Sequence, residues 1–337
     1  MVKGKPMGKG KHRQENGRSI HATLLAAAVA VAVPASAQQP GSDEELATKL
    51  SNPVASLISV PFQFNWDHDF GPDREGHKSY LNIQPVVPAK LNSDWTLISR
   101  VIVPIVDQRI PFLGDGSQSG VGDITGEFFF SPTKPGPGGI IWGVGPAILI
   151  PTGTDFISAD KWALGPTAVV LKQESGWTYG ALVNHLWSVG GSGSQNISNT
   201  FLQPFLSYTT KDAWTFGLNA ESSYDWRAEQ WTVPINATVS KLTRIGKQPL
   251  SLGVGARYYA DSPSTGPHGW GARLIVTLLF PGIGERTAVP QNPTVKESSI
   301  CFPSEAVLDG SGTPRRSSGC SEWRTNSNQG SKKGRPT

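Results

Sequence analysis

The 337-residue sequence has little cysteine, no long hydrophobic run and little helical periodicity. Its only cysteines are Cys301 and Cys320. They can pair in an oxidising compartment, but nothing in the sequence requires a disulfide. The apolar run Thr23–Val33 is too short for a membrane-spanning helix, which takes about 20 residues. Beyond it, only Asp43–Leu50 shows a short helical pattern, which excludes a mainly helical fold.

Charge is also sparse, at 17% of residues, and the net charge of +4 comes from two basic ends that outweigh an acidic middle. Residues 1–37 contain six bases and one acid, and residues 281–337 contain eight bases and five acids. The sixteen bases and twenty acids that remain in 38–280 make that part acidic. A nucleic-acid partner is therefore not expected, because it needs basic residues clustered on the folded domain.

Catalytic motifs are missing as well. The segment Gly116–Gly120 has glutamine where a nucleophile elbow needs serine, and no P-loop or H-E-x-x-H sequence occurs. His185 and Ser188 are the one pair that suggests an outer-membrane esterase or phospholipase, although the surrounding pattern of that family is lacking. We expect no enzyme activity and no cofactor. We also expect no metal site, since His68, His77 and His268 lie near predicted loops, where histidines are usually solvated.

The N-terminus has the anatomy of a secretory signal peptide. Six basic residues precede the run Thr23–Val33, and Ala35-Ser36-Ala37 follows it. A basic region, an apolar stretch and a small-residue site are typical of a cleaved leader. Residues 1–37 are therefore predicted to be a signal peptide, and the mature protein is predicted to leave the cytoplasm.

Between residues 58 and 280, apolar and polar residues alternate with a period of two, which predicts an all-β protein. In 214–226, one parity begins and ends on tryptophan, and the other is polar throughout. Turn-rich segments such as Pro135–Gly139 separate the runs. The pattern predicts about twelve strands, near 58–67, 79–90, 94–107, 120–131, 139–151, 161–173, 176–189, 197–209, 213–226, 230–242, 249–260 and 269–280.

Strand length favours a membrane barrel over a soluble sandwich. Strands in globular proteins usually have about 5–6 residues, whereas these have 10–14. Twelve steps from Trp214 to Trp226 cover roughly 40 Å, and a tilt of about 40° reduces this to about 30 Å, enough for the apolar band of an outer-membrane barrel. We therefore predict a transmembrane antiparallel β-barrel of the outer-membrane type in the bacterial outer membrane, with outer-membrane lipid and the barrel-insertion machinery as partners.

The two parities predict two sets of residues. Arginine at the lipid midplane costs about 2–4 kcal/mol, so polar residues inside strands are expected to face a lumen, with the arginines paired to acids such as Glu127 or Glu221. The predicted lumen residues are Asn82, Gln84, Arg100, Asp123, Glu127, Asn219, Glu221, Asn236, Arg257 and Arg273. The predicted interfacial aromatic girdle is Trp95, Trp142, Trp177, Trp187, Trp214, Trp226, Trp231 and Trp270.

Two further features concern the strands themselves. The last predicted strand, with Trp270, Leu278 and Phe280 on one apolar parity, resembles a terminal strand that the insertion machinery reads. Prolines inside strands remove ladder donors and are expected at bulges or kinks. They are Pro61, Pro85, Pro88, Pro104, Pro146, Pro166, Pro204 and Pro234.

Several phrases of the sequence are similar to a bacterial family of outer-membrane transporters of the phenol meta-pathway type, often labelled transporter or neuromedin U. They are NPVASLISVPFQFNWD (52–67), LNIQPVVPAKLN (81–92), GVGDITGEFFFSP (120–132), GVGPAILIPTGTD (143–155), WALGPTAVVLKQ (162–173) and LGVGARYYADSP (252–263). The resemblance covers roughly 43–280 and implies an envelope barrel that passes small molecules, aromatic or hydrophobic ones included. It supplies no functional residues.

The remaining segments complete the predicted organisation. Residues 38–57 are expected to form a periplasmic or plug segment before the barrel at 58–280. Residues 281–337 are rich in Ser, Gly, Pro, Arg and Lys without periodicity, a composition that predicts a disordered tail. This tail departs from the family pattern, because such barrels normally stop where it begins.

Two main functions follow, from different classes. In the first, the barrel is a passive channel for a small-molecule solute. In the second, side chains and Asp43–Leu57 fill the lumen, and the barrel is a closed structural or adhesion protein. Twelve strands allow either. Glycines on the inward parity at 217, 253, 255 and 271 leave room in the lumen and favour the channel.

Overall fold

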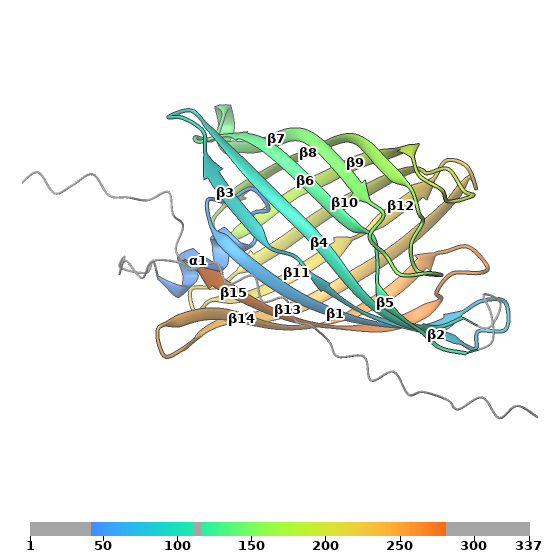
Figure 1. The fold of residues 1–337 in the computed structure, drawn as a ribbon. Helices are drawn as coiled ribbons and strands as arrows, with labels where there is room; N and C mark the ends of the chain where they lie inside the picture. Colours follow the sequence, from blue (N-terminus) through green and yellow to red (C-terminus); the bar gives the residue numbers. More distant parts are fainter. Residues whose placement is uncertain (1–41, 111–115, 281–337) are drawn as a thin grey trace, which may run out of the picture. The chain divides into compact units, whose positions relative to one another are not determined.

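A computed structural model describes residues 42–110 and 116–280. The predicted signal peptide 1–37, the predicted tail 281–337 and residues 38–41 lie outside the described residues. Within the described part, one helix precedes a single antiparallel sheet that closes on itself as a barrel (Figure 1). No helix in residues 42–110 or 116–280 is long and apolar enough to cross a membrane.

The helix is α1 (Asp43–Leu50), and a short 3-10 turn covers Pro137–Gly139. The strands are β1 (Ile58–Phe70), β2 (Gly76–Ile83), β3 (Val86–Lys90), β4 (Trp95–Arg109), β5 (Gln118–Val121), β6 (Ile124–Pro132), β7 (Ile140–Ile150), β8 (Trp162–Glu174), β9 (Trp177–Gly190), β10 (Ser198–Thr209), β11 (Trp214–Ala220), β12 (Ser222–Asp225), β13 (Gln230–Ile245), β14 (Gln248–Asp261) and β15 (Gly269–Phe280).

These fifteen strands form twelve barrel strands, which we call staves, because three staves are interrupted. β2 with β3 and β11 with β12 each lie between the same two neighbours, and β5 and β6 both pair with β4. Neighbouring staves pair antiparallel around the barrel, and β15 pairs with β1 from Phe280 opposite Ile58 to Gly271 opposite Asp67. The predicted twelve-stranded antiparallel barrel is therefore confirmed. Three of the predicted strands, 79–90, 120–131 and 213–226, are split.

Proline explains where the staves are split. At each interruption an amide donates to the carbonyl of a proline on the neighbouring strand: Gln84 to Pro61, Gly122 to Pro104 and Glu221 to Pro234, at 2.8–3.0 Å. Proline has no N–H to donate in return, so the ladder loses a rung at each of these positions. At the Pro104 site the pairing also shifts by one residue between β5 and β6, which makes a bulge.

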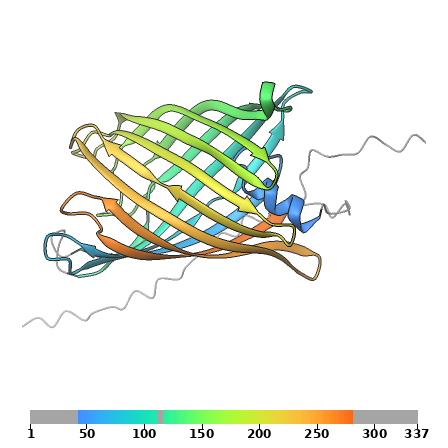
Figure 2. The same cartoon turned by 180° about the vertical axis from the view of Figure 1, so that it is seen from behind.

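The two ends of the barrel differ in the length of their connections. At one end, turns as short as Ser175–Gly176 and Gly246–Lys247 join the strands, and the same end carries Ile58 and Phe280. The other end has longer loops, such as 151–161. Short turns are typical of the periplasmic end of such barrels, and α1 lies at this end (Figure 2). We refer to the two ends as the short-turn end and the loop end.

The outer face of the barrel is apolar. Leu218 and Phe216 are 50% and 52% exposed in mid-strand, and Leu274 is 50% exposed on β15. Four of the predicted girdle tryptophans, Trp95, Trp142, Trp177 and Trp214, lie at the short-turn end, and the other four, Trp187, Trp226, Trp231 and Trp270, lie at the loop end. Trp142 is less exposed than the others and meets Trp95 edge to face, with ring centroids 5.9 Å apart.

The closing strand β15 carries the predicted terminal-strand residues. Trp270 is 67% exposed at its loop end, and Leu278 and Phe280 lie opposite Val60 and Ile58 of β1. Their recognition by the insertion machinery stays a prediction.

An exposed mid-barrel leucine tests the lipid-facing assignment. We expect Leu274→Arg to lower the free energy of unfolding in lipid by about 2–4 kcal/mol, because the charge meets the hydrocarbon core. Ile245→Arg, at an exposed position where β13 ends, is the matched control and should cost about 0–1 kcal/mol. Urea unfolding in vesicles, followed by tryptophan fluorescence, measures both changes. Equal costs at the two positions would contradict the assignment.

Candidate solute site in the barrel lumen

The alternation that turns apolar side chains to the outside turns polar ones into the lumen. Six of the ten predicted lumen residues line one cavity: Asn82, Gln84, Arg100, Asn219, Glu221 and Arg273. Three more, Glu127, Asn236 and Arg257, hydrogen-bond to members of that set. The structure thus brings nine of the ten together.

Asp123 is the exception, because it neither lines this cavity nor hydrogen-bonds to the residues that do. Its carboxylate accepts hydrogen bonds from the Gly153 amide at 3.0 Å, the Ser158 hydroxyl at 2.6 Å and the Ala159 amide at 2.8 Å. The residue follows the bulge opposite Pro104, which interrupts the alternation on which the prediction relied. Asp123 therefore holds the 151–161 loop at the loop end.

Glu221 is shared by two arginines. Arg273 donates to both of its oxygens, from Nη1 to Oε1 at 2.9 Å and from Nη2 to Oε2 at 2.7 Å, while Arg257 Nη2 donates to Oε2 at 2.6 Å. Both guanidinium groups are buried, with side-chain exposures of 2% and 4%. A fork-to-fork arrangement of this kind is the strongest form of the arginine–carboxylate pair.

The same two arginines also form hydrogen bonds to residues other than Glu221. Arg257 donates to Asp67 Oδ2 at 3.1 Å and to Asn236 Oδ1 at 2.9 Å, and it contacts the Tyr80 hydroxyl. Arg273 Nε donates to Asn65 Oδ1 at 2.7 Å. A side chain at Gly271 could not fit here, since its Cβ would lie 2.6 Å from Asp67 Oδ1 and 2.8 Å from a backbone carbonyl.

Sequence reasoning missed Asn65, Asp67 and Tyr80 as members of this network. The sequence pattern did indicate the two residues on β1, because Asn65 and Asp67 alternate with the exposed Phe64 and Trp66. Tyr80 gave no such signal, since an aromatic residue inside a strand is ordinarily assigned to the lipid face.

A second, smaller group joins Arg100 of β4 and Glu127 of β6 to Asn184 of β9 and to Gln84, which lies in the gap between β2 and β3. Arg100 Nη1 donates to Glu127 Oε2 at 3.2 Å, and Nη2 donates to Gln84 Oε1 at 2.8 Å. The other oxygen of Glu127 accepts from Asn184 Nδ2 at 2.7 Å. Asn184 was also missed, because the residues before and after it on the same face of β9, Leu182 and Leu186, are apolar.

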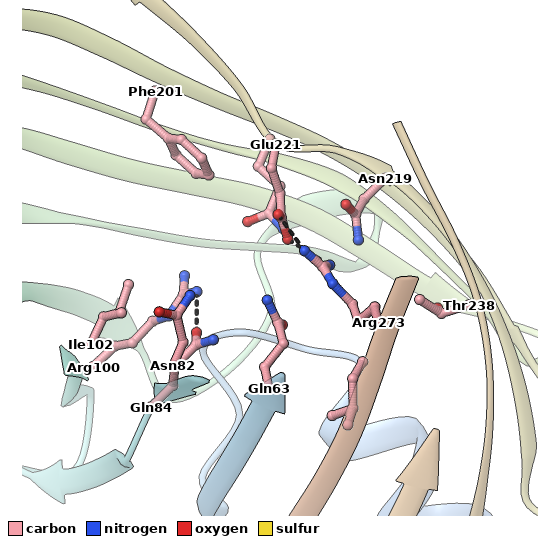
Figure 3. Close-up of a pocket in the computed structure, with 12 residues that line it drawn as sticks. Gln63, Asn82, Gln84, Arg100, Ile102, Phe201, Asn219, Glu221, Thr238 and Arg273 are labelled. Atoms are coloured by element: carbon pink, nitrogen blue, oxygen red, sulfur yellow. Dashed lines mark hydrogen bonds and ion pairs between the residues drawn. The ribbon is translucent and has the colours of Figure 1, made fainter. Parts of the chain in front are cut away.

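The cavity between the two groups has a volume of about 240 Å³ (Figure 3). Figure 3 shows Arg100 on one side of it and the Arg273–Glu221 pair on the other. Amide side chains dominate the rest of the wall, and the apolar members are Ile102, Phe201 and Ile275. The site is thus polar, with apolar patches, and can accept a solute that has both kinds of surface.

The segment 42–57 lies between this cavity and the short-turn end. Val54 is buried against a layer of inward side chains, Ile98, Phe129, Val169, Leu171 and Leu182. Polar ties hold the segment as well: Asp43 pairs with Arg244 at 2.7 Å, and Gln173 Nε2 donates to the Thr48 carbonyl at 2.8 Å. The segment leaves two cavities beside it, of about 180 and 260 Å³.

The first of these cavities shares Gln84, Arg100 and Gln203 with the central one. Arg100 is the one charged side chain that lines both. The two cavities are therefore neighbours, and Arg100 belongs to the wall of each.

The His185–Ser188 pair does not assemble. His185 Nδ1 contacts Thr200 Oγ1 at 2.7 Å, and its ring stacks at 4.0 Å on the exposed Trp187 of the outer face. Ser188 instead accepts a hydrogen bond from the Ile197 amide at 3.1 Å. The two residues are three apart on one strand, so their side chains point to opposite faces.

Among residues 42–110 and 116–280, no cluster of three or more potential metal ligands occurs.

Comparison with solved structures places the fold among outer-membrane barrels. The COG4313 outer membrane channel from Pseudomonas putida F1 matches with a TM-score of 0.53 and 15% identity, over 66% of this chain and 95% of that one. No family model and no curated protein matches the sequence. At this identity the similarity shows a shared fold. Together with the apolar outer face, it locates the barrel in the bacterial outer membrane.

Two further barrels are more distant. The outer membrane phospholipase A from Escherichia coli matches with a TM-score of 0.41 and 11% identity, over 66% of this chain and 92% of that one. The KdgM porin matches with a TM-score of 0.40 and 12% identity, over 66% of this chain and all of that one. Scores this low support no functional conclusion.

The shared carboxylate is expected to dominate the stability of the lumen. Glu221→Gln leaves two buried arginines without their common anion and should lower the free energy of unfolding by about 3–5 kcal/mol. Glu174→Gln is the matched control, because Glu174 also pairs with a base, Lys172, but is 49% exposed at the short-turn end; exposed pairs contribute little. Urea unfolding in vesicles measures both. A similar loss in the two variants would contradict the network.

Proposed function

We propose that this protein is a channel through which small molecules diffuse passively across the outer membrane, without energy coupling. The observation that supports it most is the polar cavity in the lumen, which shares Arg100 in its wall with a second cavity beside the N-terminal segment. The fold shared with an outer-membrane channel supports the same proposal. In this proposal the outer-membrane lipid, the insertion machinery and the solute are the partners, and the barrel catalyses no reaction.

The solute must be small and partly polar. The central cavity of about 240 Å³ is lined by five amide side chains and three charged ones beside its apolar patches. The family resemblance points to aromatic or hydrophobic compounds, and Phe201, Ile102 and Ile275 offer surface for their apolar parts. Paired charges along the wall let a polar solute exchange hydration for side-chain contacts without binding too tightly to leave.

The N-terminal segment supports a second candidate, the closed structural barrel. Val54 is 6% exposed in the apolar layer, and Leu57 is equally buried against Leu242 and Leu279. Such packing closes much of the lumen near the short-turn end. In the channel proposal the segment is displaceable, since Ala47 is the one buried residue of α1 and the other seven are half-buried or exposed.

A charge at position 54 separates the two candidates. We expect Val54→Asp to expel the segment, because an unpaired carboxylate in an apolar layer is strongly unfavourable, and to raise single-channel conductance severalfold in planar bilayers. Ser56→Asp is the matched control, since Ser56 is exposed in the same segment, and it should leave the conductance unchanged.

Insertion is checked separately by resistance to SDS unfolding without heating. If wild-type protein and both variants insert and none of them conducts, the channel proposal fails and the closed structural barrel stands. Flux of a neutral solute into vesicles that ends when its gradient is spent would support the passive mechanism.

A further inference from the structure

The acid that lines the central cavity is already bound by two arginines of the barrel wall. Glu221 is the one acid among the twelve lining residues, and its oxygens already accept three N–H groups from Arg257 and Arg273. The acid nearest to Arg100, Glu127, is 2% exposed and is held by Arg100 and Asn184. The carboxylates of the lumen are therefore engaged with its walls.

The donors, in contrast, are not all used. Arg100 makes two hydrogen bonds, one from each terminal nitrogen, to Glu127 and Gln84. A guanidinium has five N–H groups, so three remain. Its side chain is 19% exposed, compared with 4% for Arg257 and 2% for Arg273. It is the accessible arginine of the cavity.

Uncommitted amides surround this arginine. No side-chain hydrogen bond within residues 42–110 and 116–280 engages Gln63, Asn82 or Gln203, and all three line the cavity with Arg100. The side-chain oxygen of Gln84 accepts a hydrogen bond from Arg100, which leaves the NH₂ group of the same side chain to donate. The three free amides can donate or accept, whereas Arg100 and the NH₂ group of Gln84 only donate. The site thus has a surplus of hydrogen-bond donors around one cation, and the group that matches this surplus is an acceptor with negative charge.

We propose, on the basis of the channel function above, that the central cavity selects small amphipathic carboxylates and that Arg100 binds the carboxylate group. Arginine fits a carboxylate through two parallel N–H bonds, and Ile102, Phe201 and Ile275 contact the apolar remainder of the solute. Because Arg100 lines both neighbouring cavities, a carboxylate that moves from one to the other meets it.

The charge balance points to a monoanion. The three arginines of the two groups face three acids, Asp67, Glu127 and Glu221, so the network is neutral as a whole. A single carboxylate gains the local field of Arg100, whereas a second anionic group finds no unpaired cation within the cavity wall. The same balance keeps the binding weak enough for release, which conduction requires.

Flux of hexanoate and hexanamide into vesicles tests the inference, because the two solutes differ mainly in charge. Wild-type protein should pass hexanoate at least fivefold faster than hexanamide at neutral pH. Arg100→Gln/Glu127→Gln, which removes the cation and its buried acid together, should bring the ratio close to one. Arg100→Lys should keep part of the preference. Lys211→Gln, an exposed turn position, is the control and should not change the ratio.

Two measurements keep the outcomes distinct. Resistance to SDS unfolding establishes that each variant forms the barrel. Calorimetric titration of hexanoate into the full-length protein in detergent reports binding without transport. If both solutes pass at the same rate in wild type and variants, the inference is overturned and the channel stands. If neither solute passes but hexanoate binds and the double variant loses that binding tenfold, the channel fails and the carboxylate site stands.

Discussion

The alternation of side chains along strands long enough to cross a membrane constrains every other feature of this protein. A strand residue has only two directions available, lipid or lumen, and the two surroundings penalise opposite kinds of side chain. Tryptophan at the strand ends and leucine between them follow from the first penalty. The burial of Arg257 and Arg273 within a neutral network follows from the second, since a lumen this narrow cannot hydrate them fully.

Proline disturbs that alternation at places that matter for the site. Gln84 and Glu221 both lie at interruptions opposite a proline, and both line the central cavity. Each position lacks one hydrogen bond between neighbouring strands, but the register continues across both positions, so the two side chains still point inward. At Pro104 the register shifts instead, and the neighbouring Asp123 turns to the loop.

This difference explains how much could be predicted from the sequence. Period-two patterning specifies the barrel, the number of staves and nine of the ten lumen residues, because the direction of a side chain depends only on local parity. The pairing of Glu221 with two arginines from β14 and β15 depends on how the staves close, which no local pattern contains. Asp123 shows the limit of this reasoning. The extra residue of the bulge at Pro104 interrupts the alternation, and this interruption is visible only in the strand register.

The two groups of charges divide the work of the lumen. The Glu221 group is largely buried and joins residues from six staves, so it braces the wall. The Arg100 group is smaller and more open, and it lies where the central cavity meets the space beside the N-terminal segment. Rigid pairs at one wall and a partly free arginine at the other give the lumen a fixed shape and one adjustable contact. In the proposed channel, displacement of Val54 from its apolar layer would extend the lumen from that contact toward the short-turn end, so the segment and Arg100 would act in series on one path.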